Sequence, residues 1–325
     1  MRVVLIGGSR LNKIKKPLED IGVECILLKS FFELFKKFDP PIDAIITDTP
    51  GIGILKGLIL KITNNAPLIY RMRGNYWQEV ETEGKLAKLR LLIANNILFR
   101  LCDGVVVVNK YLKKEYWRRI RCEERVVVVG LPIDIGRFSS TIRTKSEEFS
   151  IITLTNFDYW DKIKTIVDYI DVIDGFLKDV KGKWYIAGKG KYLNRFLEII
   201  KEYQTVEYCG FVKPEEILKR CDVMVHLSEF EGLPNAVLEG MSAGLPVIVN
   251  DYEPLKEIEH VIVVRNKKDL LDWLWKLYDN IGLRKRFQRI GIKSSLNTYK
   301  NYVKNICKII SLVNSKKLIY GSRKC

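Results

Sequence analysis

The chain has 325 residues, of which 47% are hydrophobic and 29% are charged. This length exceeds that of one ordinary domain, and the balance of apolar and charged residues excludes a disordered or fibrous protein, so we expect two globular domains. The net charge of +16 is uneven, because residues 281–325 carry 12 basic and no acidic side chains.

The amino-terminal sequence MRVVLIGGSR reaches a glycine pair after a short apolar segment, which indicates a first strand and not a signal peptide. The seven cysteines are scattered and show no Cys-x-x-Cys spacing, which argues against a zinc site and a disulfide framework. No uncharged apolar stretch approaches the roughly 18 residues needed to span a bilayer. We expect a cytoplasmic protein.

The first 130 residues alternate short apolar segments with stretches of helical length. The apolar segments are RVVLI, ECILL, DAIITD, PLIYR, GVVVV and RVVVV. Uninterrupted β-branched segments separated by helices are typical of buried parallel strands. They predict a doubly wound α/β domain.

Residues 85–100 lie between two of these strands and interleave basic with apolar side chains. This pattern indicates a basic amphipathic helix, which suits an anionic membrane surface at the inner face of the cell membrane. The alternative is a core helix with one solvated face. No RNA-binding signature or zinc finger is present, so we do not expect nucleic acid as a partner.

A polar stretch, residues 134–149, interrupts the alternation and predicts a linker. A second series of strands follows, with the segments SIITL, WYIAG, VEYCG, DVMVH, PVIVN and HVIVV. Helices are expected over 161–174, 190–203 and 267–280, and one or two more over 283–313. The predicted divisions are an acceptor-binding domain (1–145), a donor domain (146–296), and a basic terminal helix or tail (297–325) packing back toward the first domain.

The most specific segment, residues 226–249, reads HLSEFEGLPNAVLEGMSAGLPVIV. It lies between two predicted strands, so it forms a loop and a short helix at the carboxyl end of a strand. Asn235 is suited to cap this helix, and Gly244 to end it.

This loop has the groups that a nucleotide diphosphate-sugar requires. Amides at the helix start, near Gly232, Leu233 and Pro234, can bind a pyrophosphate. Glu231 and Glu239 supply carboxylates for vicinal hydroxyls. Two glutamates at this separation also occur by chance on protein surfaces.

The segment SEFEGLPNAVLEGMSAGLPVI resembles the donor-site motif of the retaining glycosyltransferases of family 4, with two glutamates separated by seven residues. Further segments within residues 100–265 also resemble this family. They are CDGVVVVNKYL, PIDIGRF, WYIAGKG and YCGFVKP. The resemblance implies a GT-B fold, in which two Rossmann-like domains face a cleft, with a nucleotide-sugar donor and no metal or other cofactor.

The resemblance also implies roles for individual residues. Glu239 would hold the ribose hydroxyls, Glu231 the hydroxyls of the transferred sugar, and Lys162 the pyrophosphate. The other donor-binding candidates are Asn156, Gly188, Lys189, Phe211, Val212 and the segment 232–235.

One departure concerns an arginine that the family usually has roughly five residues before the lysine. Asn156, Phe157 and Asp158 stand there instead. Arg73, Lys189 and Lys191 are the candidates to replace its charge.

In the first domain, Gly7 and Gly8 follow the first strand and either approach the sugar diphosphate or form a simple tight turn. Arg73 and Asn75 lie in a polar segment that we interpret as the acceptor side, the alternative being an ordinary loop. Both histidines, His226 and His260, belong to the second domain, so we expect no histidine base on the acceptor side. His226 either supports the donor loop or is a core residue.

The predicted function is retaining, metal-independent transfer of a sugar from a UDP- or GDP-sugar to a glycan, lipid-linked or protein acceptor. One alternative is a catalytically weak donor-binding partner subunit. Another is a nucleotide-sugar epimerase of the same architecture.

Overall fold

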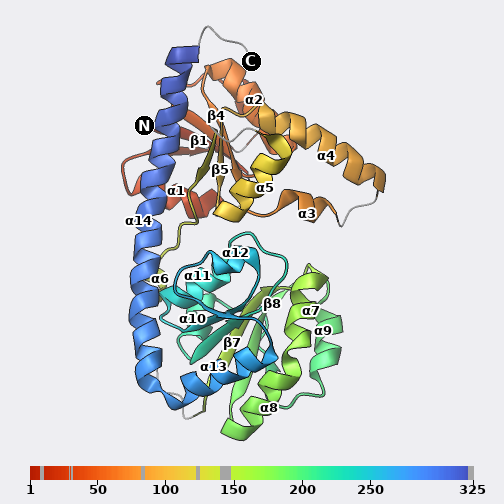
Figure 1. Cartoon of the computed structure of the whole chain (residues 1–325). Helices are drawn as coiled ribbons and strands as arrows, with labels where there is room; N and C mark the ends of the chain where they lie inside the picture. Colours follow the sequence, from red (N-terminus) through yellow and green to blue (C-terminus); the bar gives the residue numbers. More distant parts are fainter. Residues whose placement is uncertain are drawn as a thin grey trace. The chain divides into compact units, whose positions relative to one another are not determined.

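A computed structural model describes residues 1–7, 11–28, 30, 32–81, 85–121, 125–139 and 148–320, apart from the side chains of residues 12, 13, 87, 90, 94, 139 and 316–320 (Figure 1). The chain divides into two compact units. The first comprises Met1–Pro132 and Thr298–Cys325, and the second comprises Ile133–Asn297.

The described part of the first unit contains one six-stranded sheet in which every pairing is parallel. Its strands, in spatial order, are β2 (Glu24–Leu27), β1 (Arg2–Ile6), β3 (Ala44–Thr47), β4 (Leu68–Met72), β5 (Gly104–Val107) and β6 (Val126–Val128). The chain moves outward from β1 to β2 and then continues on the other side of β1. The topological switch point of this sheet therefore lies between β1 and β3.

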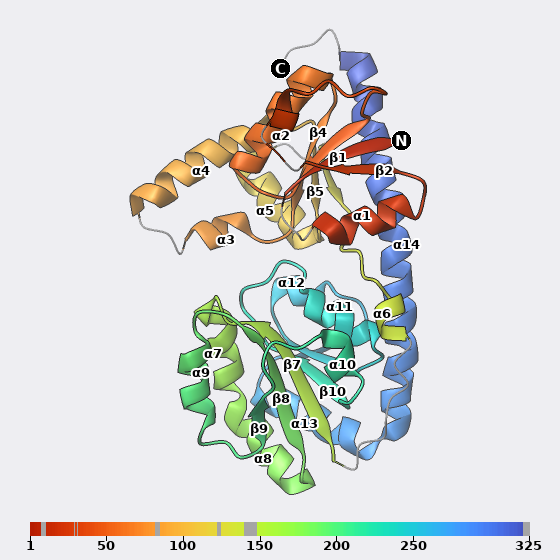
Figure 2. The same ribbon diagram turned by 180° about the vertical axis from the view of Figure 1, so that it is seen from behind.

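Helices cover both faces of this sheet (Figures 1 and 2). They are α1 (Asn12–Glu19), α2 (Ile52–Asn64), α3 (Tyr76–Val80), α4 (Lys85–Arg100), α5 (Lys110–Ile120) and the second part of α14 (Ile281–Tyr320), with a 3-10 turn, η2 (Phe32–Phe35). One buried cluster joins β1, β3, α1 and α14, and includes Val3, Ile46, Ile14 and Ile306. On the other face, Phe99 of α4 stacks on Tyr70 of β4 with ring centroids 4.9 Å apart.

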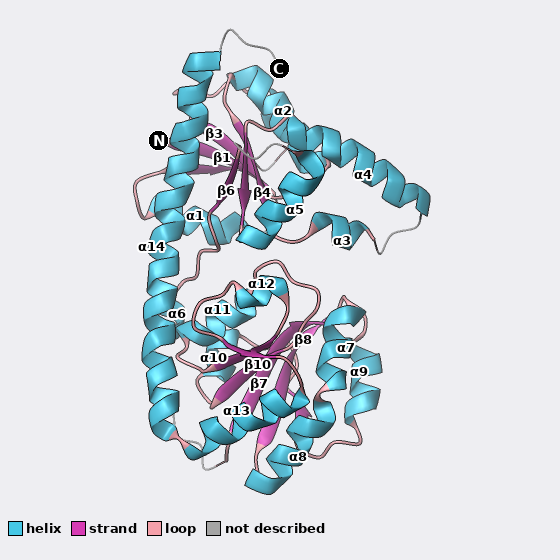
Figure 3. Cartoon of the chain, in the orientation of Figure 1, coloured by secondary structure: helices cyan, strands magenta, loops and turns pink. Residues whose placement is uncertain are grey.

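The second unit repeats the plan, with a second six-stranded parallel sheet among its described residues (Figure 3). Its strands, in spatial order, are β12 (Ile262–Val264), β11 (Val247–Asn250), β10 (Val223–His226), β7 (Ser150–Asn156), β8 (Lys183–Lys189) and β9 (Val206–Tyr208). Here the switch point lies between β7 and β10. Open α/β sheets bind ligands outside the carboxyl ends of the strands at such a point.

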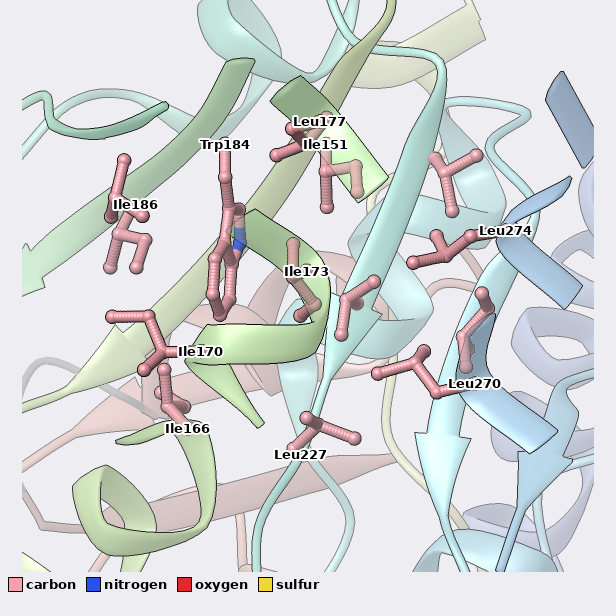
Figure 4. Close-up of a cluster of buried hydrophobic side chains, with 14 of the residues drawn as sticks. Ile151, Ile166, Ile170, Ile173, Leu177, Trp184, Ile186, Leu227, Leu270 and Leu274 are labelled. Atoms are coloured by element: carbon pink, nitrogen blue, oxygen red, sulfur yellow. The ribbon is translucent and has the colours of Figure 1, made fainter. Parts of the chain in front are cut away.

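The helices of the second unit surround this sheet. They are α6 (Gly136–Ser139), α7 (Trp160–Asp168), α8 (Ile170–Val180), α9 (Leu193–Ile200), α10 (Pro214–Leu218), α11 (Asn235–Ser242), α12 (Glu253–Lys256), α13 (Lys267–Asp279) and the first part of α14. Figure 4 shows a core cluster of this unit, in which Trp184 lies among Ile151, Ile173 and Ile186. The indole Nε1 of Trp184 donates to Thr153, so its one polar atom is satisfied.

The two sheets confirm the expected fold class, and all twelve predicted strands are present. One helix prediction is wrong, and the terminal segment resolves to one of the two expected forms. The helix expected over 161–174 is two helices, α7 and α8, which meet at Tyr169, whose φ of −110° and ψ of 0° leave the α region. The terminal segment forms the single helix α14.

Candidate functional site

The carboxyl ends of β7 and β10 bring together the most specific residues of the sequence. Nζ of Lys162, on α7, lies 2.7 Å from Oε1 of Glu231, in the loop after β10. The side chains are only 14% and 10% exposed. The ion pair thus spans the switch point of the sheet, although its partners are 69 residues apart in the chain.

His226 completes this group. It is the last residue of β10, it is buried, and its Nε2 lies 3.3 Å from Oε1 of Glu231. The sequence left open whether His226 supports the loop or is a core residue. It is both buried and in contact with Glu231, a contact that only its position just before the loop indicates in the sequence.

Two opposing effects act on the Glu231 carboxyl. Burial raises the pKa of Glu231, but His226 and Lys162 outweigh this effect and hold the pKa below its ordinary value. Glu231 is therefore a carboxylate at neutral pH. Because the Glu231 carboxylate is already paired with Lys162, a polar ligand can bind to it only by replacing part of that pairing.

The loop between β10 and α11 is held by hydrogen bonds and a ring stack. The amide of Ser228 donates to Oδ1 of Asn250 (2.8 Å), and the amide of Phe230 donates to the Ser228 hydroxyl (3.2 Å). The rings of Phe230 and Tyr159 are stacked, with centroids 4.5 Å apart. This packing fixes the backbone on both sides of Glu231.

Helix α11 begins without a side-chain cap. Its N-cap residue is Pro234, and Asn235 is the first helical residue with an exposed side chain, so the expected cap by Asn235 is wrong. At the other end, Gly244 adopts the expected left-handed conformation with φ of +80°. The uncapped amides at the start of α11 carry the positive end of the helix dipole, and Gly232 and Leu233 precede them.

Glu239 lies one turn inside α11 and is 9% exposed. A carboxylate almost never lies in such a position without polar partners. The charge of Glu239 acts on Arg137 of α6, whose guanidinium pairs with Glu215 of α10 at 2.7 Å. Glu239 therefore belongs to a polar group on the α6, α10 and α11 side of the second unit.

The end of β8 is joined through backbone hydrogen bonds to the segments that follow β7 and β9. The amide of Phe157 donates to the Lys189 carbonyl (3.0 Å), and the amide of Gly188 donates to the Gly210 carbonyl (3.0 Å). Gly188 has φ of +153°, and a Cβ there would lie 1.9 Å from the Thr155 carbonyl oxygen. Only glycine permits this close approach.

Side chains at this edge are more exposed than those at the ion pair. Oδ1 of Asn156 accepts from the amide of Asp158 (2.9 Å), which closes the turn after β7. Nζ of Lys189 lies 4.1 Å from the centroid of the Phe211 ring, which is 70% exposed. Val212 is half-buried beside it.

The predicted residues of the first unit form a separate group. Nε of Arg73 lies 3.3 Å from Oδ2 of Asp48. Gly7 is next to Asp48 as well, and Gly8 lies outside the described residues. Asn75 is buried, caps α3 by accepting from the amide of Gln78 (3.3 Å), and donates to the Tyr111 hydroxyl (3.0 Å).

The described residues contain neither a group suited to bind a metal ion nor a helix suited to span a membrane. No three His, Cys, Asp or Glu side chains among them form a group suited to a metal ion. None of the helices described is both long enough and apolar enough to cross a membrane.

Residues 148–280, which include most of the second unit, match a family model described as glycosyl transferases group 1. A viral protein, ORF31 (isolate Australia/Victoria), provisionally named a glycosyltransferase, is 27% identical over 266 residues, or 81% of each chain. The glycosyltransferase MJ1059 of Methanocaldococcus jannaschii, named as uncharacterized, is 26% identical over 91% of this chain and 75% of its own.

Solved structures share the fold. A glycosyltransferase from Rickettsia africae has a TM-score of 0.70 at 15% identity, covering 96% of this chain and 89% of that one. Anabaena Alr3699/HepE, in complex with UDP and glucose, has a TM-score of 0.68 at 15% identity, covering 98% and 100%. TarM of S. aureus has a TM-score of 0.67 at 15% identity. The match covers 84% of this chain but only 56% of TarM. The two doubly wound units have the GT-B fold.

Proposed function

We propose that this chain, a glycosyltransferase with the GT-B fold, transfers a sugar from a nucleotide-sugar to an acceptor hydroxyl with retention of configuration and without a metal ion. The observation that carries the proposal is the buried Lys162–Glu231 pair at the switch point of the second sheet, beside the uncapped start of α11. This edge offers a cation, helix amides and a carboxylate together. A sugar diphosphate requires these groups.

In this proposal, residues of the second unit have separate roles in the transfer step. In the transfer step, the bond between the sugar C1 and the diphosphate oxygen breaks, and the bond from C1 to the acceptor oxygen forms on the same face. Lys162 and the amides at the start of α11 stabilise the charge that develops on the diphosphate. The acceptor proton goes to the leaving phosphate, so no histidine base is needed. Glu231 accepts hydrogen bonds from the sugar, and Glu239 from the ribose.

The remaining predicted residues form the wall of the donor site in this proposal. The backbone of Gly188 and the side chains of Asn156 and Lys189 line the diphosphate and sugar. The segment at Phe211 and Val212 contacts the base, for which the exposed Phe211 ring offers an apolar face. Lys189 takes over part of the charge of the arginine that the sequence lacks.

UDP-sugars are the first donors to test, because the Anabaena structure holds UDP and glucose. GDP-sugars are the second. We expect one nucleoside diphosphate to raise the Tm of the protein, since a ligand that binds only the folded state stabilises it by about 2.7 kcal/mol at 100 times its Kd. A thermal melt with UDP, GDP and ADP at equal concentration measures this effect. Equal melting curves with all three and with buffer alone would contradict nucleotide binding.

Transfer itself separates the proposal from its alternatives. With the stabilising donor and a mixture of glycan and lipid-linked acceptors, we expect a glycosylated product whose anomeric configuration equals that of the donor, and an unchanged rate in EDTA. A weak partner subunit binds the donor but releases no nucleotide. An epimerase converts the donor sugar without any acceptor.

We also propose that the protein binds the inner face of the cell membrane through α4. This helix buries Phe99 and Asn95 on one side, as a core helix does. Its other side exposes a stripe of four apolar residues at helical spacing, namely Leu86 (75%), Leu89 (57%), Ile93 (55%) and Ile97 (56%). Basic residues flank the stripe at both ends, with Lys85 and Arg100 exposed. Apolar insertion combined with charge attraction is typical of helices that lie in the membrane interface.

Replacing Leu89 and Ile93 by serine is therefore expected to lower binding to anionic vesicles at least tenfold, because each side chain contributes about 1.5 kcal/mol or more when it leaves water. Flotation with phosphatidylglycerol-containing vesicles at low salt measures the bound fraction. The matched control replaces Ile281 (59% exposed) and Leu296 (43% exposed) of α14 by serine and should float like the wild type. Equal flotation of both double variants would contradict α4 as the contact.

A further inference from the structure

The first unit contains a group of charged side chains at its own switch point. Asp48 directly follows β3, Arg71 lies within β4, and Arg73 follows β4. The side chain of Asp48 is only 2% exposed, and Arg71 as a whole is 3% exposed. A charged group this close to the carboxyl ends of the strands lies where open α/β sheets place their ligands.

Arg71 is the unusual member. Its position in β4 places it on the same face of the sheet as Ile69, under α1 and α14 (Figure 2). Its Nε has no hydrogen-bond partner among the described residues. A guanidinium stays charged in proteins, and an unpaired charge in a buried position costs several kcal/mol.

Tyr302 of α14 is a second unpartnered polar group. It is fully buried, and its hydroxyl has no hydrogen-bond partner among the described residues. Burial raises the pKa of Tyr302 to about 12, although the charge of Arg71 acts to lower it. Tyr302 is therefore a neutral hydrogen-bond donor near Arg71 at physiological pH.

Arg71 and Arg73 differ in their pairing with Asp48. Asp48 is one carboxylate, and it faces two guanidiniums, of which Arg73 makes the ion pair at 3.3 Å. Among the described residues, Arg71 therefore makes no ion pair of its own. Arg73 is 29% exposed in its side chain and connects the buried group with solvent.

Gly7, at the end of β1, packs closely against this group. A Cβ at Gly7 would lie 2.3 Å from Oδ1 of Asp48 and 2.8 Å from a methyl carbon of Leu11. Any side chain there would displace Asp48 from its place next to Arg73. Glycine at position 7 therefore lets the end of β1 pack directly against Asp48.

We infer that Arg71, Arg73 and Tyr302, positioned by Asp48, bind an oxyanion, and that this oxyanion is a phosphate or carboxylate group of the sugar acceptor. Guanidiniums match both groups with paired hydrogen bonds. The donor diphosphate already has its cation and helix amides in the second unit under the function proposed above, on which this inference rests. The acceptor is then anionic, which excludes neutral glycans as preferred substrates.

The test uses thermal melts of the full chain with glucose 1-phosphate, glucuronate, neutral glucose and UDP as probes, at constant ionic strength. We expect glucose 1-phosphate or glucuronate, but not glucose, to raise the Tm of the wild type. For Arg71→Met and for Arg73→Gln, at least ten times more probe should be needed to reach the same rise in Tm. Arg118→Met, which removes an exposed arginine of the same unit, should respond like the wild type.

Stability separates a binding role from a structural one. If Arg71 serves to bind an anion, its buried charge is unpaired in anion-free buffer. Arg71→Met removes this charge and should therefore have the same Tm as the wild type or a higher one. A Tm lowered by many degrees would overturn the inference, as would the absence of any response of the wild type to both anionic probes. If Arg71→Met does not fold, Arg73→Gln still tests anion binding, because Arg73 is partly exposed and its replacement should be tolerated.

UDP distinguishes the sources of the anion. The UDP response should be the same in Arg71→Met and the wild type, because the nucleotide binds the second unit. Loss of the UDP response in Arg71→Met would assign the oxyanion to the donor and overturn the acceptor assignment. If UDP stabilises the wild type but neither anionic probe does, this inference fails while the proposed function stands.

Discussion

Replacing Lys162 by alanine is expected to lower kcat for sugar transfer by about 10²- to 10³-fold, the loss typical of removing one group that stabilises developing negative charge. Lys162 is a largely buried cation at the switch point of the second unit. Without it, the leaving diphosphate keeps only the helix amides. Initial rates of nucleotide release with saturating donor and acceptor measure the effect. Lys164→Ala, on the same helix but exposed, is the control and should keep wild-type turnover.

A second comparison separates catalysis from stability. Lys162→Ala leaves Glu231 buried with only His226 beside it, which should destabilise the fold by about 3–5 kcal/mol. The double variant Lys162→Ala, Glu231→Gln removes both charges and should regain much of this stability without regaining activity. Recovery of transfer in the double variant would show that Lys162 only neutralises Glu231.

The pH dependence of stability follows from the same pair. Because the folded pKa of Glu231 is lower than its ordinary value of 4.5, its charge stabilises the fold above that pH, and the contribution is lost as the pH falls through the lowered pKa. The difference in unfolding free energy between the wild type and the double variant should therefore be largest near neutral pH. It should shrink below about pH 4.

The sequence predicted the strands of this protein well because most of them are short apolar segments. The inner strands, such as GVVV in β5 and VMVH in β10, are buried at every residue and apolar with little interruption, which is typical of parallel strands covered on both faces. The break between α7 and α8 was not predicted. Tyr169, where the backbone leaves the α region, is neither proline nor glycine, so no local signal marks it.

The sequence pointed to the residues of the candidate site but not to the contacts between them. The loop motif pointed to Glu231 and Glu239, and the resemblance to a family pointed to Lys162. The direct contact of Lys162 with Glu231 depends on the strand order that places β7 next to β10, which no local pattern encodes. The burial of Arg71 was not predicted, because the residue stands at the junction of the apolar segment PLIYR and the polar segment interpreted as the acceptor side.

Replacing Glu239 by glutamine is expected to raise the Kd of the bound nucleoside diphosphate by about 10- to 100-fold, because a hydrogen bond to a charged group is worth about 1.5–3 kcal/mol. The amide of glutamine accepts only through one oxygen and carries no charge, whereas a carboxylate can hold two vicinal ribose hydroxyls at once. Calorimetric titration of the stabilising nucleotide measures the change. Glu259→Gln, at an exposed position of the same unit, is the control and should bind like the wild type.

The 2′-deoxy form of the same nucleotide makes this test specific to the ribose. The wild type should bind the 2′-deoxy nucleotide more weakly than the ribonucleotide, and Glu239→Gln should bind the two almost equally, because the carboxylate that distinguishes them is gone. A role of Glu239 that is only structural, through its polar group with Arg137 and Glu215, would weaken both nucleotides by the same factor and preserve the preference. The ratio of the two dissociation constants therefore decides whether Glu239 touches the ribose, whatever the change in overall stability.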